Sequence, residues 1–135
     1  MNPTYGYRII NTENIELKPN AATTVYAYGD WLTPDGTGAY IPAAATQKLA
    51  GVCLENITSS DPRYTTPALF YTDFSLEIDT FTIPVTTGTA IASMVGSTFD
   101  LDTPQSLDVS APGTQFEILQ ILSTTLVVVR VVLTV

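Results

Sequence analysis

Groups of turn-forming residues recur along this chain and divide it into short segments, and this division is the feature that most restricts its fold. Short groups made up almost entirely of Gly, Pro, Asp, Ser and Thr occupy residues 29–30, 34–36, 59–62, 86–88, 103–104 and 111–113. Such spacing leaves room for short strands only, as in a sandwich or a barrel. Residues 1–22 show no sustained period. The sequence therefore predicts an all-β fold, a small antiparallel β-barrel or sandwich over residues 23–135, preceded by an extended N-terminal arm over residues 1–22.

The clearest predicted strand covers residues 70–78. Its buried face would hold Phe70, Thr72, Phe74, Leu76 and Ile78, and its solvent face Tyr71, Asp73, Ser75, Glu77 and Asp79. The apolar phase then slips by one residue to Phe81, Ile83 and Val85, which predicts a bulge or tight turn around Asp79 and Thr80. Pro84 favours an edge position in the strand that follows.

The C-terminal residues predict a hairpin, with strands over residues 115–122 and 126–135 and a turn at residues 123–125. Both faces of the last strand are mostly apolar, so it must be covered on both sides, as a central strand or in a subunit interface. Residues 43–49 are the one helix candidate. A single turn or a loop is as good an interpretation, because about seven residues do not sustain a helix alone.

Composition excludes several classes of function. The chain of 135 residues has 13 acidic and 5 basic residues and a net charge of −8, the wrong sign for binding nucleic acid. It contains no histidine, so imidazole-based catalysis and His-ligated metals are excluded within the chain. Cys53, the one cysteine, lies in an apolar run and is predicted to be buried. We expect no cofactor and no enzymatic activity.

The carboxylates do not form a recognisable site. Asp100 and Asp102 begin like a calcium-binding loop, but Pro104 stands at the fifth ligand position and no glycine follows. Glu77 and Asp79 have the spacing of a glycosidase pair, which any solvent-facing strand with two acids would also have. We expect no signal peptide, and no membrane segment, because the longest apolar run, residues 126–133, is interrupted by Arg130.

Aromatic residues are concentrated in the N-terminal third, and four of the five basic residues lie in the first half. The aromatic residues are Tyr5, Tyr7, Tyr26, Tyr28, Trp31 and Tyr40. Exposed aromatic side chains bind proteins or glycans, so these residues are candidates for a binding surface.

Several segments together resemble the capsid decoration, or cement, proteins of tailed bacteriophages. The resemblance runs through Val25-Tyr26-Ala27-Tyr28-Gly29-Asp30-Trp31-Leu32, Asp35-Gly36, Tyr40-Ile41-Pro42-Ala43-Ala44 and Leu49-Ala50-Gly51-Val52-Cys53-Leu54-Glu55. It continues through Val95-Gly96-Ser97-Thr98-Phe99-Asp100-Leu101 and the C-terminal hairpin. It is a pattern of turns and small residues without a catalytic signature. The resemblance implies a small β-barrel-like protein, commonly a homotrimer, that binds the outside of an assembled head and reinforces the major capsid protein.

The predicted function is therefore a non-enzymatic virion protein on the capsid exterior, assembled in the host cytoplasm. Its partners would be the major capsid protein and further copies of itself, without nucleic acid or membrane. The predicted partner-binding residues are Tyr5, Tyr7, Ile9 and Ile10 in the arm, with Tyr26, Tyr28, Trp31 and Tyr40. Two alternatives stay open: another virion component, such as a tail-tube, head-completion or head-fibre attachment protein, and a carbohydrate-binding module.

Overall fold

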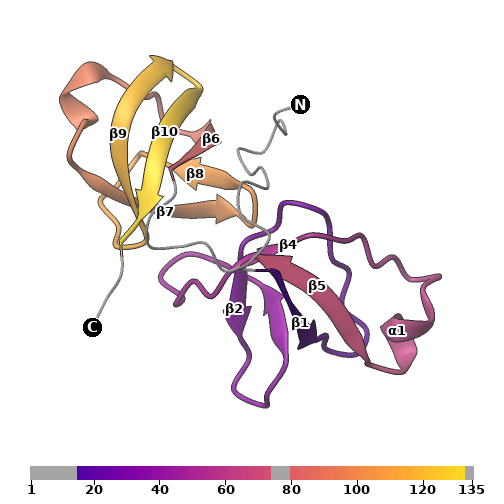
Figure 1. Cartoon of the computed structure of the whole chain (residues 1–135). Helices are drawn as coiled ribbons and strands as arrows, with labels where there is room; N and C mark the ends of the chain where they lie inside the picture. The colour runs from indigo at the N-terminus through magenta and orange to yellow at the C-terminus, as the bar shows by residue number, and fades with distance from the viewer. Residues whose placement is uncertain (1–14, 74–79, 133–135) are drawn as a thin grey trace.

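The computed structural model describes residues 15–73 and 80–132, and its described residues are almost entirely strands, turns and loops. The predicted all-β class is confirmed. Residues 15–73 form an N-terminal half and residues 80–132 a C-terminal half (Figure 1). The predicted bulge at Asp79 and the far end of the strand over residues 70–78 lie outside the described residues.

The N-terminal half contains a three-stranded sheet and a separate hairpin. The sheet has the order β1-β5-β4, and the hairpin joins β2 to β3. The bounds of these elements are β1 Ile15–Pro19, β2 Leu32–Pro34, β3 Tyr40–Pro42, β4 Val52–Cys53 and β5 Leu69–Asp73. One short helix, α1 (Pro62–Thr65), begins after Asp61, whose carboxylate accepts a hydrogen bond from the Arg63 N–H. The sequence predicted only a turn there. Residues 43–49 form turns and no helix.

Strand β1 corrects the predicted N-terminal arm. Residues 15–19 are extended, as expected, but they pair antiparallel with β5 of the same chain, with Leu17 opposite Tyr71. Phe70 and Thr72 of β5 face inward and are fully buried, so pairing with β1 extends a sheet that already covers a core. Residues 1–14 of the predicted arm lie outside the described part of the chain.

The C-terminal half is a closed ring of five strand pairings with the order β10-β6-β8-β7-β9. Its elements are β6 Phe81–Thr87, η2 Ala92–Met94, β7 Thr98–Thr103, β8 Ser106–Asp108, β9 Phe116–Ser123 and β10 Leu126–Val131. Strands β6 and β8 pair in parallel, whereas the other pairs are antiparallel. The expectation of a wholly antiparallel sheet is therefore wrong at this pair.

Strand β10 is central, as one of the two predicted alternatives required, because β6 and β9 flank it. Strand β6 is flanked on both sides as well, by β10 and β8, which corrects the edge position expected from Pro84. The Val85 N–H donates to Thr125 O on the β10 side. The nitrogen of Pro84 therefore faces the β8 side, where pairing begins only at Val85, so no ladder hydrogen bond is lost.

One apolar core contains residues of both halves. Trp31, which is 1% exposed, projects from the N-terminal half and lies 5.0 Å from both the Phe81 and the Phe116 ring, edge to face. A second, smaller core lies within the N-terminal half and includes Tyr26 and Phe70. The shared core joins the two halves through aromatic packing.

Two glutamine side chains add hydrogen bonds across the junction of the halves. The Gln105 amide donates to Asp30 Oδ1 at 2.7 Å and to the Tyr28 carbonyl at 3.1 Å. The Gln115 amide nitrogen donates to the carbonyls of Ala44 and Gln47, both at 2.8 Å. These bonds satisfy backbone and side-chain groups that the junction removes from solvent.

Candidate interaction surface

The structure separates the aromatic residues that the sequence placed on one binding surface. Tyr26 and Trp31 are each 1% exposed and belong to two different cores. The Tyr26 hydroxyl donates to the Tyr40 carbonyl at 2.6 Å and accepts from the Ala21 N–H, and burial raises its pKa. Both residues are core residues, which corrects their assignment as partner contacts: their rings fill space between strands and reach no solvent.

Tyr28 and Tyr40 are half-buried and pack against different cores. The Lys18 ammonium lies 5.4 Å from the centre of the Tyr40 ring, so the lysine side chain covers part of that ring. The remaining predicted contacts, Tyr5, Tyr7, Ile9 and Ile10, lie outside the described residues. The described aromatic residues therefore form no continuous exposed row.

The largest side chains exposed on the N-terminal sheet are instead Leu17, Leu69 and Tyr71, which are 47%, 49% and 52% exposed. Leu17 and Tyr71 are cross-strand partners, and Leu69 precedes Tyr71 by two residues, so all three point to the same face of the sheet. We call these three residues the apolar sheet face. An isolated exposed leucine is ordinary, whereas three large apolar side chains on one face of a sheet form a candidate interaction site.

A group of charged residues borders the apolar sheet face. Arg63 lies 2.9 Å from Asp61 and 3.0 Å from Glu55, and it donates to the Leu69 carbonyl at 2.9 Å. The Glu55 carboxylate accepts from the Tyr71 N–H at 2.7 Å. Hydrogen bonds to Asp61 and Glu55 hold the pKa of the Arg63 guanidinium above its ordinary value. An apolar centre with an ordered polar rim, including Tyr and Arg, is the usual composition of a protein-binding surface.

The carboxylates considered for metal binding instead accept hydrogen bonds from neighbouring residues of this chain. Asp100 accepts from the backbone N–H groups of Thr114 and Gln115, and Asp102 accepts from two threonine hydroxyls. Hydrogen bonds from Ser110 lower the pKa of Asp108. Within residues 15–73 and 80–132, no three His, Cys, Asp or Glu side chains are grouped so that they could hold a metal ion. Glu77 and Asp79 lie outside the described residues.

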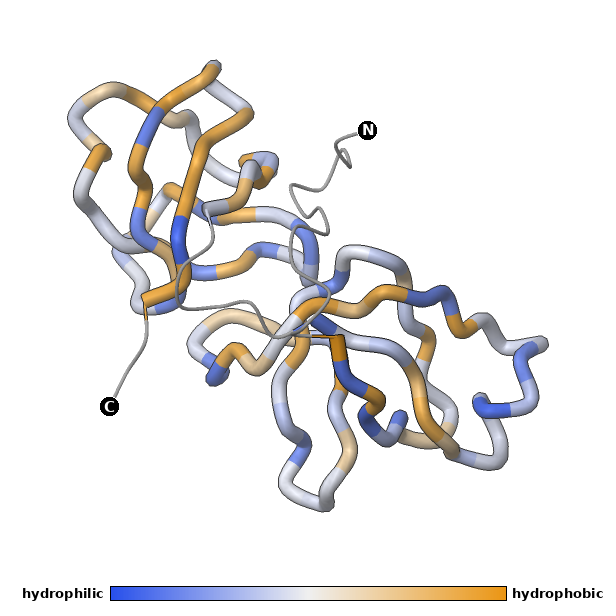
Figure 2. The backbone as a smooth tube through the Cα atoms, in the orientation of Figure 1, coloured by the Kyte–Doolittle hydropathy of each residue, from blue (hydrophilic) through white to orange (hydrophobic). Residues whose placement is uncertain are grey.

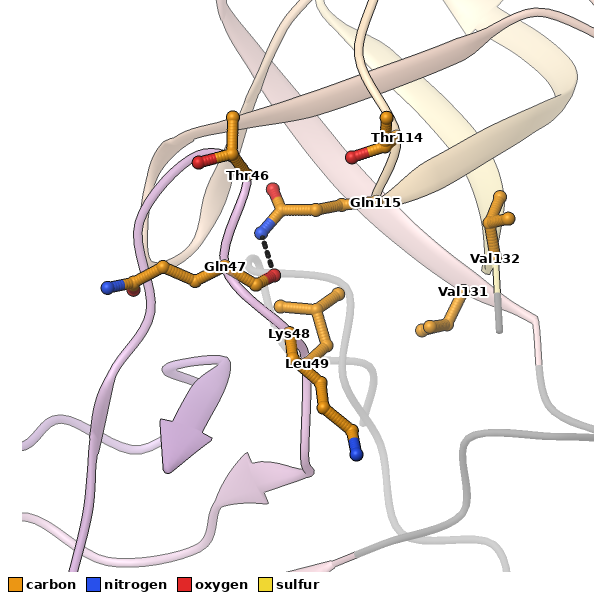
Figure 3. Close-up of a pocket in the computed structure, with 8 residues that line it drawn as sticks. All are labelled: Thr46, Gln47, Lys48, Leu49, Thr114, Gln115, Val131 and Val132. Atoms are coloured by element: carbon orange, nitrogen blue, oxygen red, sulfur yellow. Dashed lines mark hydrogen bonds between the residues drawn. The ribbon is translucent and has the colours of Figure 1, made fainter. Parts of the chain in front are cut away.

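A pocket of about 170 Å³ lies at the junction of the halves, between residues 46–49, 114–115 and 131–132 (Figure 3). Its volume is below the roughly 300 Å³ at which small-molecule sites begin. The Gln115 amide within it already donates to the Gln47 carbonyl and accepts from the Leu101 N–H at 2.8 Å. Lys48 is the one ionisable residue among those that line it. The pocket is part of the junction between the halves.

Comparisons with protein-family models, with curated proteins and with solved structures found no match to this chain.

Among the residues that the structure describes, no helix has the length and apolar character needed to cross a membrane.

The sequence contained part of the signal for the apolar sheet face. Tyr71 was placed on the solvent face of its strand, where it is observed, and a large aromatic side chain at such a position is itself a hint of a partner. Leu17 could not be assigned to the same face, because its position depends on the pairing of β1 with β5, more than 50 residues later in the chain.

Proposed function

We propose that this chain is a structural virion protein that binds the outer surface of a phage capsid and stabilises it. The observation that carries the proposal is the apolar sheet face, Leu17, Leu69 and Tyr71, in the half of the chain that also contains most of the basic residues. The resemblance of the sequence to capsid decoration proteins supports the same function. The trimeric state that this resemblance implies stays a prediction.

The charge of the chain favours the outside of the particle. A protein with a net charge of −8 would be repelled by packaged DNA. A protein that binds the assembled lattice and not free subunits shifts the assembly equilibrium toward the lattice, because its binding free energy is gained only there. The apolar sheet face would contribute this binding free energy, and Arg63 with its partners Asp61 and Glu55 would fix the orientation of the chain on the capsid.

Co-sedimentation with capsids that lack the protein tests the proposal. Wild-type protein should bind saturably, in proportion to the number of major capsid subunits. Leu69→Asp places a charge within the apolar sheet face and should weaken binding by at least about tenfold. Val25→Asp is a matched control, because Val25 is 56% exposed but lies on neither β1 nor β5. It should bind as the wild type does.

Three outcomes would contradict or redirect the proposal. Wild-type protein that does not bind capsids would refute it, and a Leu69→Asp variant that binds normally would refute the assigned surface. Binding that saturates at a few copies per particle would favour the head-completion, tail or fibre-attachment alternative. The carbohydrate-binding alternative is weakened, because two of the aromatic residues that would contact a glycan, Tyr26 and Trp31, are buried.

A further inference from the structure

The charged residues of this chain are unevenly distributed. The chain has 13 acidic and 5 basic residues, yet none of them lies within residues 80–99 or residues 118–129. These stretches contain 20 and 12 consecutive uncharged residues. In an acidic protein, two such long stretches define a surface of different character if the fold brings them together.

The fold does bring them together, at one end of the five-strand ring. The Ala90 N–H donates to the Thr124 carbonyl at 3.0 Å, so the connection after β6 contacts the turn between β9 and β10. The Gly96 N–H donates to the Ile118 carbonyl at 2.8 Å, which fixes the η2 segment beside β9. We call residues 88–97 and 120–125 the uncharged end. It lies away from the N-terminal half, at the tip of the β9-β10 hairpin (Figure 1).

The uncharged end exposes three large apolar side chains, Ile91, Val95 and Leu122, which are 51%, 50% and 46% exposed. Its other exposed residues are mainly Thr, Ser and Gly, and the backbone there is mostly pale or orange in Figure 2. Asp102 marks its border, where two threonine hydroxyls at the end of β6 hydrogen-bond to the carboxylate.

We propose that copies of this chain bind each other through the uncharged end. Two copies that each carry a net charge of −8 repel one another on approach. Contact through a surface without charged side chains keeps the like charges apart and removes no charge from water. Apolar and hydroxyl groups are also compatible with a second copy of the same surface, as a symmetric contact requires.

The extent of the uncharged end suits such a contact. A specific interface of standard size buries about 800 Å² on each partner. This is roughly one ninth of the 6973 Å² surface of the chain. Thirteen residues of the uncharged end are exposed, about half of the roughly 20–30 residues that each partner contributes at standard size, which fits a small contact of the transient kind. The apolar sheet face, in the other half, stays available for a different partner.

The test is the mass of the full chain in solution, measured by sedimentation equilibrium over a range of protein concentrations without capsids. Wild-type protein should have a mass of at least twice the 14.5 kDa of one chain. Leu122→Asp should raise the dissociation constant by at least about tenfold. Leu69→Asp is the matched control, since Leu69 is also a half-exposed leucine, 49% against 46%, and lies in the other half. It should remain associated.

A second variant and the salt dependence keep the test decisive. Ile91→Ser removes apolar area without adding a charge and should also weaken association, and circular dichroism checks that both variants are folded. Added salt should strengthen association, because it screens the repulsion between acidic copies. A monomeric wild type would overturn the proposal, as would dissociation by Leu69→Asp but not by Leu122→Asp. Because no capsid is present, either result is independent of the proposed capsid binding.

Discussion

Trp31 is the residue whose replacement tests the observed junction between the halves most directly. Replacing a buried tryptophan by alanine costs about 3–5 kcal/mol, through lost transfer free energy and the cavity that remains. Two edge-to-face aromatic pairs, with Phe81 and Phe116, are lost as well, each worth about 0.5–1.5 kcal/mol within that total. Domains of this size are stable by about 5–15 kcal/mol. Trp31→Ala should therefore fold but lose a large part of its free energy of unfolding.

Urea denaturation measures this loss. Far-UV circular dichroism follows the unfolding of wild type, Trp31→Ala and Trp31→Phe, and the phenylalanine variant should lose about 1–2 kcal/mol because it retains one ring. Trp31 is the single tryptophan of the chain, so its fluorescence in the wild type reports on the junction alone. It should be protected from acrylamide quenching until the protein unfolds. A loss below about 1 kcal/mol for Trp31→Ala, or a readily quenched native tryptophan, would refute the shared core.

Three other residues give simpler tests. Gly88 and Gly36 have φ of +84° and +87°, but a Cβ at Gly88 would lie 2.8 Å from a backbone nitrogen, whereas one at Gly36 would meet nothing within 4 Å. Gly88→Ala should thus lower the calorimetric midpoint more than Gly36→Ala, and equal effects would argue against the close contact. Burial raises the pKa of Cys53 to about 12, so a thiol reagent should label native protein far more slowly than urea-unfolded protein, and rapid native labelling would contradict that burial. Burial also raises the pKa of Asp30 above its ordinary 3.8, so the native state binds the Asp30 proton more tightly than the unfolded chain does. Protonation of Asp30 therefore favours the native state, and this contribution to the free energy of unfolding is lost as pH rises. Urea midpoints of the wild type should therefore fall relative to those of Asp30→Asn as the pH rises above about 4, and parallel curves would count against this effect.

Features with a local signal were predicted well. Phe81, Ile83 and Val85 are buried as their alternation indicated, and the hairpin of β9 and β10 lies where its β-branched residues and turn placed it. Cys53 is buried within its apolar run. In each case the side-chain period of two, or a continuous apolar run, determines which residues face the core.

Features set by contacts between distant parts of the chain were not predicted. Trp31 lies among turn residues without a local period, and its burial depends on Phe81 and Phe116, which are 50 and 85 residues away. Asp73 was expected on the solvent face but is 1% exposed, because β5 has partners on both sides at that position, Ile15 and Val52. Neither outcome follows from the neighbouring residues, since both depend on which strands pair.

The two proposed surfaces lie in different halves, so a reinforcing role would depend on the stiffness of the junction between them. The apolar sheet face could hold the uncharged end in place only if the halves resist bending. The junction consists of aromatic packing around Trp31 and amide hydrogen bonds from Gln105 and Gln115. Most of these contacts do not involve opposite charges, so salt should affect the junction little. The proposed association of copies, by contrast, should strengthen with salt. The two effects can therefore be separated in one salt series, with tryptophan fluorescence reporting the junction and sedimentation reporting the association.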